Sequence, residues 1–316
     1  MKKRKLGQSG IYVSPIAFGG NVFGWTVDEK QSFKLLDAFV DAGFDFIDTA
    51  DTYSWWVDGN TGTESETIIG KWLAERKNRD KIILSTKVGS QTKEHPKNNS
   101  KEFILKSVED SLRRLKTDYI DLYQTHFDDE VTPVEETLSA YAQLIEEGKV
   151  RAIGTSNMSA ERIRESLKAS SENGLPKYET LQPHYNLMER ENYEKVLRPI
   201  VEENNMGVIN YYSLASGFLA GKYRSKDDFN KSPRGYGMEK YLTDKGFKVL
   251  EALEKVSEKH NTTLATISLA WLLARPTITA PIVSATSLKQ LESIINAPML
   301  KLDEADMEML NKSSSW

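Results

Sequence analysis

Short apolar runs alternate with longer amphipathic segments along the whole chain. Between Leu105 and Leu115, and again between Val134 and Leu144, apolar residues recur every three or four positions, which predicts helices with one apolar face. The runs between such segments predict eight strands, near residues 15–18, 44–48, 82–87, 119–124, 151–155, 179–183, 207–211 and 278–283. This alternation predicts an α/β fold, a (β/α)₈ TIM barrel, with residues 1–316 as one barrel domain.

Two further segments belong to this expected architecture. Residues 5–13 resemble a small N-terminal β-hairpin ahead of the first strand, which would plug the barrel floor. Residues 216–241 form the longest irregular stretch, a loop after strand seven that is too long for an ordinary connection and therefore a candidate functional loop. A doubly wound open sheet is the competing fold. Against it, the chain has no G-x-G-x-x-G motif, and its nearest glycine cluster runs from Gly19 to Gly24.

Local signals place the ends of one helix. Thr132 and Pro133 offer an N-cap followed by a proline in the first helical position, with two glutamates in the first turn. Glu147 and Gly148 supply a stop before the next strand. We therefore expect a helix between residues 133 and 147.

Composition narrows the class of protein. The 316 residues are 39% hydrophobic and 28% charged, so a sizeable core is expected, and the net charge of −4 is interspersed, which argues against nucleic-acid binding. The chain has no cysteine, hence no disulfide, thiolate nucleophile or cysteine metal site. No run approaches the ~18 apolar residues of a membrane span, and no apolar segment of a secretory signal follows the basic start. These features indicate a cytoplasmic protein without a membrane partner.

Polar residues of complementary chemistry end three of the predicted strands. Asp48, Lys87 and His126 close strands two, three and four, and Tyr53 follows five residues after Asp48. Strands of a parallel barrel all end on one face, where active sites are built, and neighbours are roughly 4.8 Å apart. Each residue alone has a structural explanation: a turn cap for Asp48, a lysine extending from a strand end, a structural histidine, and simple packing for Tyr53. Their joint placement favours a site.

The four side chains together describe a proton donor. A free phenol, with a pKa of about 10, is too weak an acid at neutral pH, and a nearby ammonium is expected to lower that value. A buried Lys87 needs a carboxylate such as Asp48 to stay charged. His126 would orient a substrate oxygen. Tyr53 would then donate a proton to a carbonyl oxygen while the carbon receives a hydride, which no amino-acid side chain supplies, so a nicotinamide cofactor is implied.

Nearly from end to end, the chain resembles the aldo-keto reductase superfamily, in its bacterial and potassium-channel β-subunit-like branch. The resemblance is carried by six motifs, which are Asp48-Thr49-Ala50-Asp51-Thr52-Tyr53, Ser85-Thr86-Lys87, Gln124-Thr125-His126, Gly154-Thr155-Ser156-Asn157, Gln182-Pro183-His184-Tyr185-Asn186 and Gly217-Phe218-Leu219-Ala220-Gly221-Lys222-Tyr223. It implies a barrel that binds NADPH without a Rossmann domain, and a catalytic tetrad of Asp48, Tyr53, Lys87 and His126 with Tyr53 as the acid.

The resemblance also implies cofactor contacts. By matched position these are Ser156, Asn157 and Gln182 at the carboxamide, Tyr211 on the nicotinamide ring, Ser213, Leu214 and Ser216 at the pyrophosphate, Lys222 and Arg234 on the covering loop, and Ser284, Thr286 and Gln290 at the 2′-phosphate, beside a helix N-terminus. Core packing is the alternative for Tyr211. A solvated charged loop is the alternative for Lys222 and, more strongly, for Arg234.

Two departures from the family pattern bear on the cofactor. Ser293 and Ile294 stand where many members have Glu and Asn to hold adenine, and near Thr286 many members have Arg or Lys, whereas here Lys289 is the nearest charge. NADP(H) is therefore expected by family habit, and NAD(H) is retained as an alternative.

The expected substrate pocket is mostly aromatic. Trp25, Trp55, Trp56 and Phe127 suit a small-molecule carbonyl or alcohol with an apolar or sugar face. Asp128 and Asp129 would bind hydroxyl groups, or be solvated loop residues. The sequence holds no information on oligomeric state.

The resemblance and the tetrad together favour a reductase of aldehydes or ketones that also oxidises alcohols. A sugar-directed catabolic dehydrogenase and a slow, redox-sensing NADPH-binding regulatory subunit are the alternatives. A metal-dependent hydrolase is disfavoured and no metal site is expected, because the chain has four histidines and no H-x-H motif at a strand end.

Overall fold

The computed structural model describes residues 2–235 and 237–316. Its main sheet has eight parallel strands in the order β10-β3-β4-β5-β6-β7-β8-β9. Their bounds are Ala17–Gly19 (β3), Phe46–Asp48 (β4), Ile83–Val88 (β5), Ile120–Thr125 (β6), Val150–Ser156 (β7), Thr180–Gln182 (β8), Gly207–Val208 (β9) and Ile282–Val283 (β10). Backbone hydrogen bonds from Thr279 N to Val208 O (2.8 Å) and from Ile282 N to Asn210 O (2.9 Å) join the two ends of the sheet. The predicted (β/α)₈ barrel is therefore confirmed.

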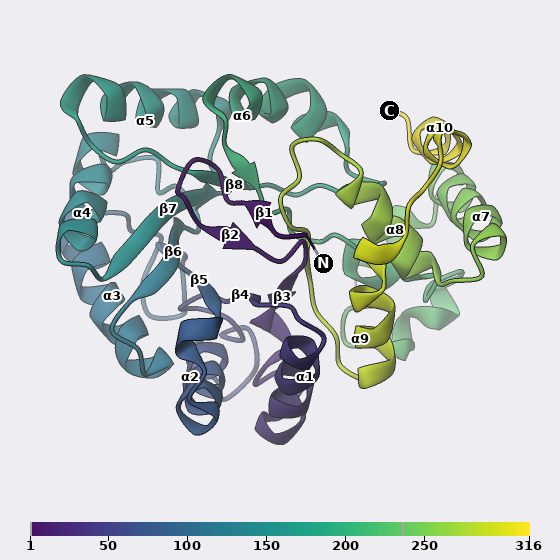
Figure 1. Ribbon diagram of the computed structural model, residues 1–316, viewed down its shortest axis with the longest axis horizontal. Coiled ribbons are helices and arrows are strands. Elements are labelled where there is room, and N and C mark those ends of the chain that lie inside the picture. Colours follow the sequence, from purple (N-terminus) through teal and green to yellow (C-terminus); the bar gives the residue numbers. More distant parts are fainter. Residues whose placement is uncertain (1, 236) are drawn as a thin grey trace.

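Helices surround this ring (Figure 1). Their bounds are Glu29–Asp41 (α1), Glu64–Arg76 (α2), Lys101–Leu115 (α3), Val134–Glu146 (α4), Ala160–Asn173 (α5), Arg198–Asn204 (α6), Asp244–Lys259 (α7), Leu264–Leu273 (α8), Leu288–Ile295 (α9) and Glu304–Ser313 (α10). Helices α7 and α10 pack against each other outside the ring, as Figure 1 shows. Within the described parts of the chain, no helix is both long and apolar enough to cross a bilayer.

Side-chain caps explain where several helices begin. Asp28, Ser100 and Ser159 each accept a hydrogen bond from the backbone N–H three residues later, which satisfies a donor that has no partner within the helix. The predicted start of α4 is wrong by one position. Pro133, not Thr132, is the N-cap residue, because the Thr132 hydroxyl donates to Asp129 Oδ2 at 2.6 Å. The predicted stop is confirmed, since Gly148 follows the helix with a φ of 72°.

The last two strands of the ring are shorter than the sequence predicts. Strand β9 has two residues where 207–211 was expected, and β10 has two where 278–283 was expected. In both places a proline interrupts the ladder, because it has no N–H to donate. Pro183 faces the continuation of β9, where Tyr211 N donates to Pro183 O, and Pro281 lies within the expected last strand.

The N-terminal hairpin closes one end of the barrel, as predicted. Strands β1 (Arg4–Lys5) and β2 (Tyr12–Val13) pair antiparallel, and Figure 1 shows them lying across the ring. The apolar side chains that the hairpin contributes are fully or almost fully buried against the starts of barrel strands; this cluster contains Leu6, Ile11, Val13, Ala17, Phe46, Leu122, Ala152, Ile209, Ala280 and Ile282. The strand starts are thereby sealed, and the opposite end of the barrel is left for a site.

The long loop after β9 is present and is anchored by three short 3₁₀ helices. These are η4 (Ala215–Ala220), η5 (Lys226–Lys231) and η6 (Met238–Tyr241). Tyr223 and Tyr241 are buried beneath the loop. The described parts of the loop place Lys222 and Arg234 over the barrel mouth, where they line the cavity described below.

The close contact between α2 and α3 depends on Gly70. A Cβ at this position would lie 1.9 Å from the carbonyl oxygen of Arg114. Helix propensity alone predicts that Gly70→Ala stabilises α2 by ~1 kcal/mol. We expect the opposite, a loss of about 1–3 kcal/mol in the free energy of unfolding, because backbone must move to admit the methyl group. Urea unfolding followed by circular dichroism measures the change, and an increase in stability would contradict this packing.

Candidate active site

A buried ion pair and a phenol lie at the carboxyl ends of two neighbouring strands. Strands β4 and β5 run side by side, so that Asp48 pairs with Ser85 in register and Lys87 lies just beyond. Lys87 Nζ is 2.6 Å from Asp48 Oδ2 and donates to Tyr53 Oη at 2.8 Å. Asp48 and Lys87 are fully buried. The structure thus brings together the carboxylate, the ammonium and the phenol that the sequence singles out.

Further donors converge on the Asp48 carboxylate. Its Oδ1 accepts hydrogen bonds from Ser85 Oγ (3.1 Å), Gln182 Nε2 (3.1 Å) and Gln124 Nε2 (3.3 Å). Neither Ser85 nor Gln124 was expected from the sequence to contact Asp48. The signal for both was their position two residues before Lys87 and His126, because a spacing of two places side chains on the same face of a strand. The Asp48 carboxylate is therefore held in place by three side-chain donors in addition to Lys87.

The pKa of Tyr53 differs from the expectation. Burial and the Asp48 carboxylate raise the pKa of the Tyr53 phenol well above its ordinary value, whereas the sequence analysis expected Lys87 to lower it. Burial also lowers the pKa of the Lys87 ammonium, although the Asp48 carboxylate opposes this shift. Both groups are shielded from water, and this desolvation disfavours the phenolate of Tyr53 and the ammonium of Lys87. Tyr53 therefore carries its proton at neutral pH.

His126 completes the group from strand β6. Its backbone N–H donates to Val88 O at 2.8 Å, and its ring centroid lies 5.9 Å from that of Tyr53. Burial and the Lys87 charge lower the pKa of the His126 imidazole well below its ordinary value, so the ring is neutral. Its Nδ1 has no hydrogen-bond partner among residues 2–235 and 237–316. The imidazole lies beside the phenol and can still form a hydrogen bond through a ring nitrogen.

A large cavity opens above this group. Its volume is about 1100 Å³, and it lies at the end of the barrel opposite the hairpin. Besides Tyr53 and His126, its wall includes all the cofactor contacts that the resemblance implies and the four aromatic residues expected at the substrate: Ser156, Asn157, Gln182, Tyr211, Ser213, Leu214, Ser216, Lys222, Arg234, Ser284, Thr286 and Gln290, and Trp25, Trp55, Trp56 and Phe127. Asp48 and Lys87 are buried and do not line the cavity.

The cavity wall is strongly cationic although the chain as a whole is acidic. Its charged side chains are Lys97, Lys222, Lys231, Arg234 and Lys289, and no Asp or Glu of the described residues lines it. Arg234 is not the solvated loop residue that the sequence allowed. Its Nη2 is shielded from solvent without a partner among the described residues, and its guanidinium lies 5.3 Å from the centroid of the Trp25 ring. Such a wall attracts an anionic ligand.

Part of the cavity wall has left-handed backbone, at Asn157 and in the turn at residues 212–216. Asn157, Tyr212, Ala215 and Ser216 have positive φ angles of 47°, 53°, 46° and 56°. Residues other than glycine rarely adopt this left-handed region, and such strain gathers at ligand sites because the surrounding structure must enforce it.

The comparisons with known proteins agree with this geometry. The model of the aldo/keto reductase family matches residues 15–315. The chain belongs to the aldo-keto reductase family. It is 33% identical to the protein named "Uncharacterized oxidoreductase YrpG" of Bacillus subtilis (strain 168), over 98% of this chain and 95% of that protein.

This aldo-keto reductase is also similar to two other relatives over most of its length. It is 32% identical to "Aldo-keto reductase YhdN" of the same organism, over 98% of this chain and 93% of that protein. It is also 31% identical to a "Probable voltage-gated potassium channel subunit beta" of Oryza sativa subsp. japonica, over 92% of this chain and 89% of that protein. Relatives with oxidoreductase names support carbonyl reduction in general terms.

Aromatic rings frame the part of the cavity above Tyr53. The rings of Trp25 and Trp56 meet edge to face at 5.6 Å, Trp56 lies 6.4 Å from Tyr53, and His126 lies 4.9 Å from Phe127. The two tryptophan contacts are edge to face and the His126–Phe127 contact is tilted, and together these rings form an aromatic frame around the phenol.

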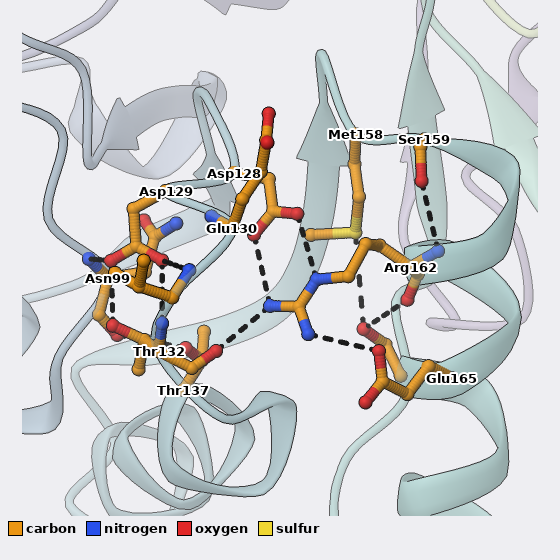
Figure 2. Close-up of polar contacts among 12 residues, drawn as sticks. Asn99, Asp128, Asp129, Glu130, Thr132, Thr137, Met158, Ser159, Arg162 and Glu165 are labelled. Atoms are coloured by element: carbon orange, nitrogen blue, oxygen red, sulfur yellow. Dashed lines mark hydrogen bonds and ion pairs between the residues drawn. The ribbon is translucent and has the colours of Figure 1, made fainter.

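The two acidic residues after Phe127 do not have the hydroxyl-binding role that the sequence allowed. Asp128 is buried, and its two oxygens accept hydrogen bonds from Arg162 at 2.9 and 3.1 Å. Asp129 accepts hydrogen bonds from Asn99 N (2.7 Å) and from the Thr132 hydroxyl (2.6 Å). Figure 2 shows both carboxylates engaged within this network. They fix the loop that carries Phe127, and neither lines the cavity, so neither is placed to bind hydroxyl groups there. Asp128 is buried and not solvated, whereas Asp129 is partly exposed, as the solvated alternative allowed.

Proposed function

We propose that this aldo-keto reductase reduces an aldehyde or ketone with a hydride from NAD(P)H, reversibly oxidises the alcohol, and uses Tyr53 as the general acid. The observation that carries the proposal is the contact of Lys87 Nζ with both Asp48 Oδ2 and Tyr53 Oη beneath the cavity. The phenol lies at the base of a space large enough for two ligands, and its environment suits it to one role. It delivers a proton to an oxygen that gains negative charge.

The hydrogen bonds leave the phenolic proton available. Lys87 donates to Tyr53 Oη, so the phenol keeps its own hydrogen, which Asp48 Oδ2 holds only weakly at 3.4 Å. As a carbonyl oxygen above Tyr53 gains charge, the proton moves from Tyr53 Oη to that oxygen. The ammonium of Lys87 then stabilises the phenolate, and Asp48 keeps Lys87 charged. The neutral His126 ring orients the carbonyl oxygen.

The cavity wall suits a dinucleotide. When bound, the nicotinamide supplies the hydride that the carbonyl carbon receives. We assign Ser156, Asn157 and Gln182 to its carboxamide and Tyr211 to its ring. The cations of the loop after β9 and the strained turn at residues 212–216 support binding of the pyrophosphate, because fixed N–H groups and positive charge favour anions.

Lys289 is the residue that we expect to distinguish NADPH from NADH. It lines the cavity in the first turn of α9, beside Thr286 and Gln290. Lys289→Ala should weaken NADPH binding by roughly 1.4- to 5-fold and leave NADH binding unchanged, because an exposed ion pair contributes about 0.2–1 kcal/mol. Fluorescence titration with both cofactors measures the two affinities.

The control for this titration is Lys248→Ala on α7, an exposed lysine that does not line the cavity. It should change neither affinity. If Lys289→Ala weakened NADH and NADPH equally, the assignment of Lys289 to the 2′-phosphate would be withdrawn.

Turnover with a panel of aldehydes, ketones and keto-sugars tests the proposed function itself. Oxidation of NADPH over many turnovers with any of them supports a reductase, and preference for keto-sugars supports the sugar-directed form of it. Binding of NADPH without multiple turnover by any carbonyl compound would favour a regulatory subunit instead, as the name of the rice relative suggests for that protein.

A further inference from the structure

One cation of the cavity wall is left without a role in the proposed function. Lys222 and Arg234 lie on the loop after β9, Lys289 lies after β10, and Lys231 is paired with Asp228 at 2.6 Å. Lys97 lies elsewhere, between β5 and α3. In the order of the strands, β5 is across the ring from β9 and β10. The phosphates of a dinucleotide held by the loops after β9 and β10 therefore do not account for Lys97.

The surroundings of Lys97 belong to the part of the cavity where the carbonyl compound would bind. Its Nζ lies 5.5 Å from the centroid of the Phe127 ring, and Phe127 in turn is next to His126. Ser90 and Gln91 line the cavity from the same segment between β5 and α3. Lys97 thus presents a positive charge beside the aromatic frame over Tyr53.

No carboxylate of the described residues neutralises Lys97. Its hydrogen bond is with a backbone carbonyl, Asp128 O, at 3.2 Å, and it forms no ion pair within residues 2–235 and 237–316. The two carboxylates on the loop that supplies this carbonyl form hydrogen bonds with other residues. The Asp128 carboxylate is bound by Arg162 through two hydrogen bonds, and the Asp129 carboxylate is bound by Asn99 and Thr132 (Figure 2).

From these observations we infer that the carbonyl substrate carries an anionic group, a carboxylate in the simplest case, which pairs with Lys97 while its apolar body lies within the aromatic frame. The inference rests on the proposed function, because it names the substrate class of the same site. Among the described residues, the Lys97 ammonium has no carboxylate partner and the cavity wall has no Asp or Glu, which favours a negatively charged ligand group over a neutral or positive one.

The experiment compares two aldehydes of the same size and different charge. With NADPH as the reductant, kcat/KM is measured for para-carboxybenzaldehyde, which is anionic, and for para-formylbenzamide, which is neutral. The pair is repeated on a flexible frame with the anion of 6-oxohexanoic acid and its amide. The enzyme should prefer the anion of at least one pair by about tenfold, which corresponds to ~1.4 kcal/mol.

Variants at position 97 test whether the Lys97 side chain causes the preference for the anionic aldehyde. Lys97→Met should remove it by raising KM for the anion, with no change for the amide, and Lys97→Arg should retain it because the charge is kept. Lys93→Met is the matched control, since Lys93 is an exposed lysine of the same segment that does not line the cavity. It should leave both substrates unchanged.

Three results separate the possible failures. Equal kcat/KM for anion and amide in both pairs would overturn the inference while leaving the reductase intact. A Lys97→Met enzyme that loses activity equally with anion and amide would also overturn it, because Lys97 would then support the fold and not the charge of the substrate. Turnover of neither aldehyde nor any member of the carbonyl panel would instead remove the proposed function.

Discussion

Replacing Tyr53 by Phe is expected to lower kcat for carbonyl reduction by roughly 10²- to 10⁴-fold, the range that a positioned general acid contributes. The substitution removes only the hydroxyl that Lys87 contacts at 2.8 Å, and the ring keeps its packing against Trp56. Tyr53 contacts Lys87 and lines the cavity, so its hydroxyl lies between the ammonium and the substrate space. NADPH affinity should stay within about twofold, since the lost hydroxyl is assigned to the carbonyl oxygen and not to the cofactor.

The control for this experiment is a second tyrosine of the barrel. Tyr123 on β6 is fully buried, and its hydroxyl has no hydrogen-bond partner among the residues that the structure describes. Tyr123→Phe should therefore leave kcat and stability close to those of the wild type. Single-turnover measurements locate the effect of Tyr53→Phe in the chemical step. Unchanged turnover in the Tyr53 variant would exclude it as the acid.

Replacing Lys87 by Met should damage both catalysis and folding. The phenolate that forms at Tyr53 would lose its cation, and we expect kcat to fall by about 100-fold or more. The Asp48 carboxylate would also remain buried without its counter-ion, which costs about 3–5 kcal/mol of stability when one partner of a buried pair is removed. Turnover and thermal unfolding should therefore decline together in the single variant.

A double variant separates these two effects. In Asp48→Asn with Lys87→Met, the remaining side chain at position 48 is a neutral amide that Ser85 and Gln182 can still hydrogen-bond. Thermal stability should recover towards the wild type, because no uncompensated charge is left in the core. Turnover should remain low, because Tyr53 still lacks its ammonium. Recovery of turnover in the double variant would show that Lys87 acts only on the fold.

The barrel was predictable because each strand is a short apolar run with polar residues at its carboxyl end. That pattern located all eight strands, and it also delivered Asp48, Lys87 and His126 to one face. The errors at the last two strands have a local cause. Pro183 and Pro281 interrupt hydrogen bonding without changing the apolar pattern, so the sequence runs look longer than the ladders that they form.

Pairings between distant residues were not predictable from the pattern. Asp128 is thirty-four positions from Arg162, and nothing in the spacing of either residue indicates the other. The same holds for Glu66 and Arg114, which form a largely buried ion pair between α2 and α3 at 2.7 Å. The prediction that Lys87 lowers the pKa of Tyr53 was wrong for a related reason. The sequence indicates that Lys87 is near the phenol, but the extent of burial, which decides the sign, is a property of the packed barrel.

The sealed strand starts make the two ends of the molecule independent of each other. Arg4 of the hairpin donates to the carbonyl oxygens of Leu273 and Ile278, at the end of the barrel remote from the aromatic frame. Anchoring the protein to a bead or electrode through this end would leave the mouth of the cavity facing the solution. The enzyme could then be immobilised in one orientation, and small molecules could still enter and leave the cavity.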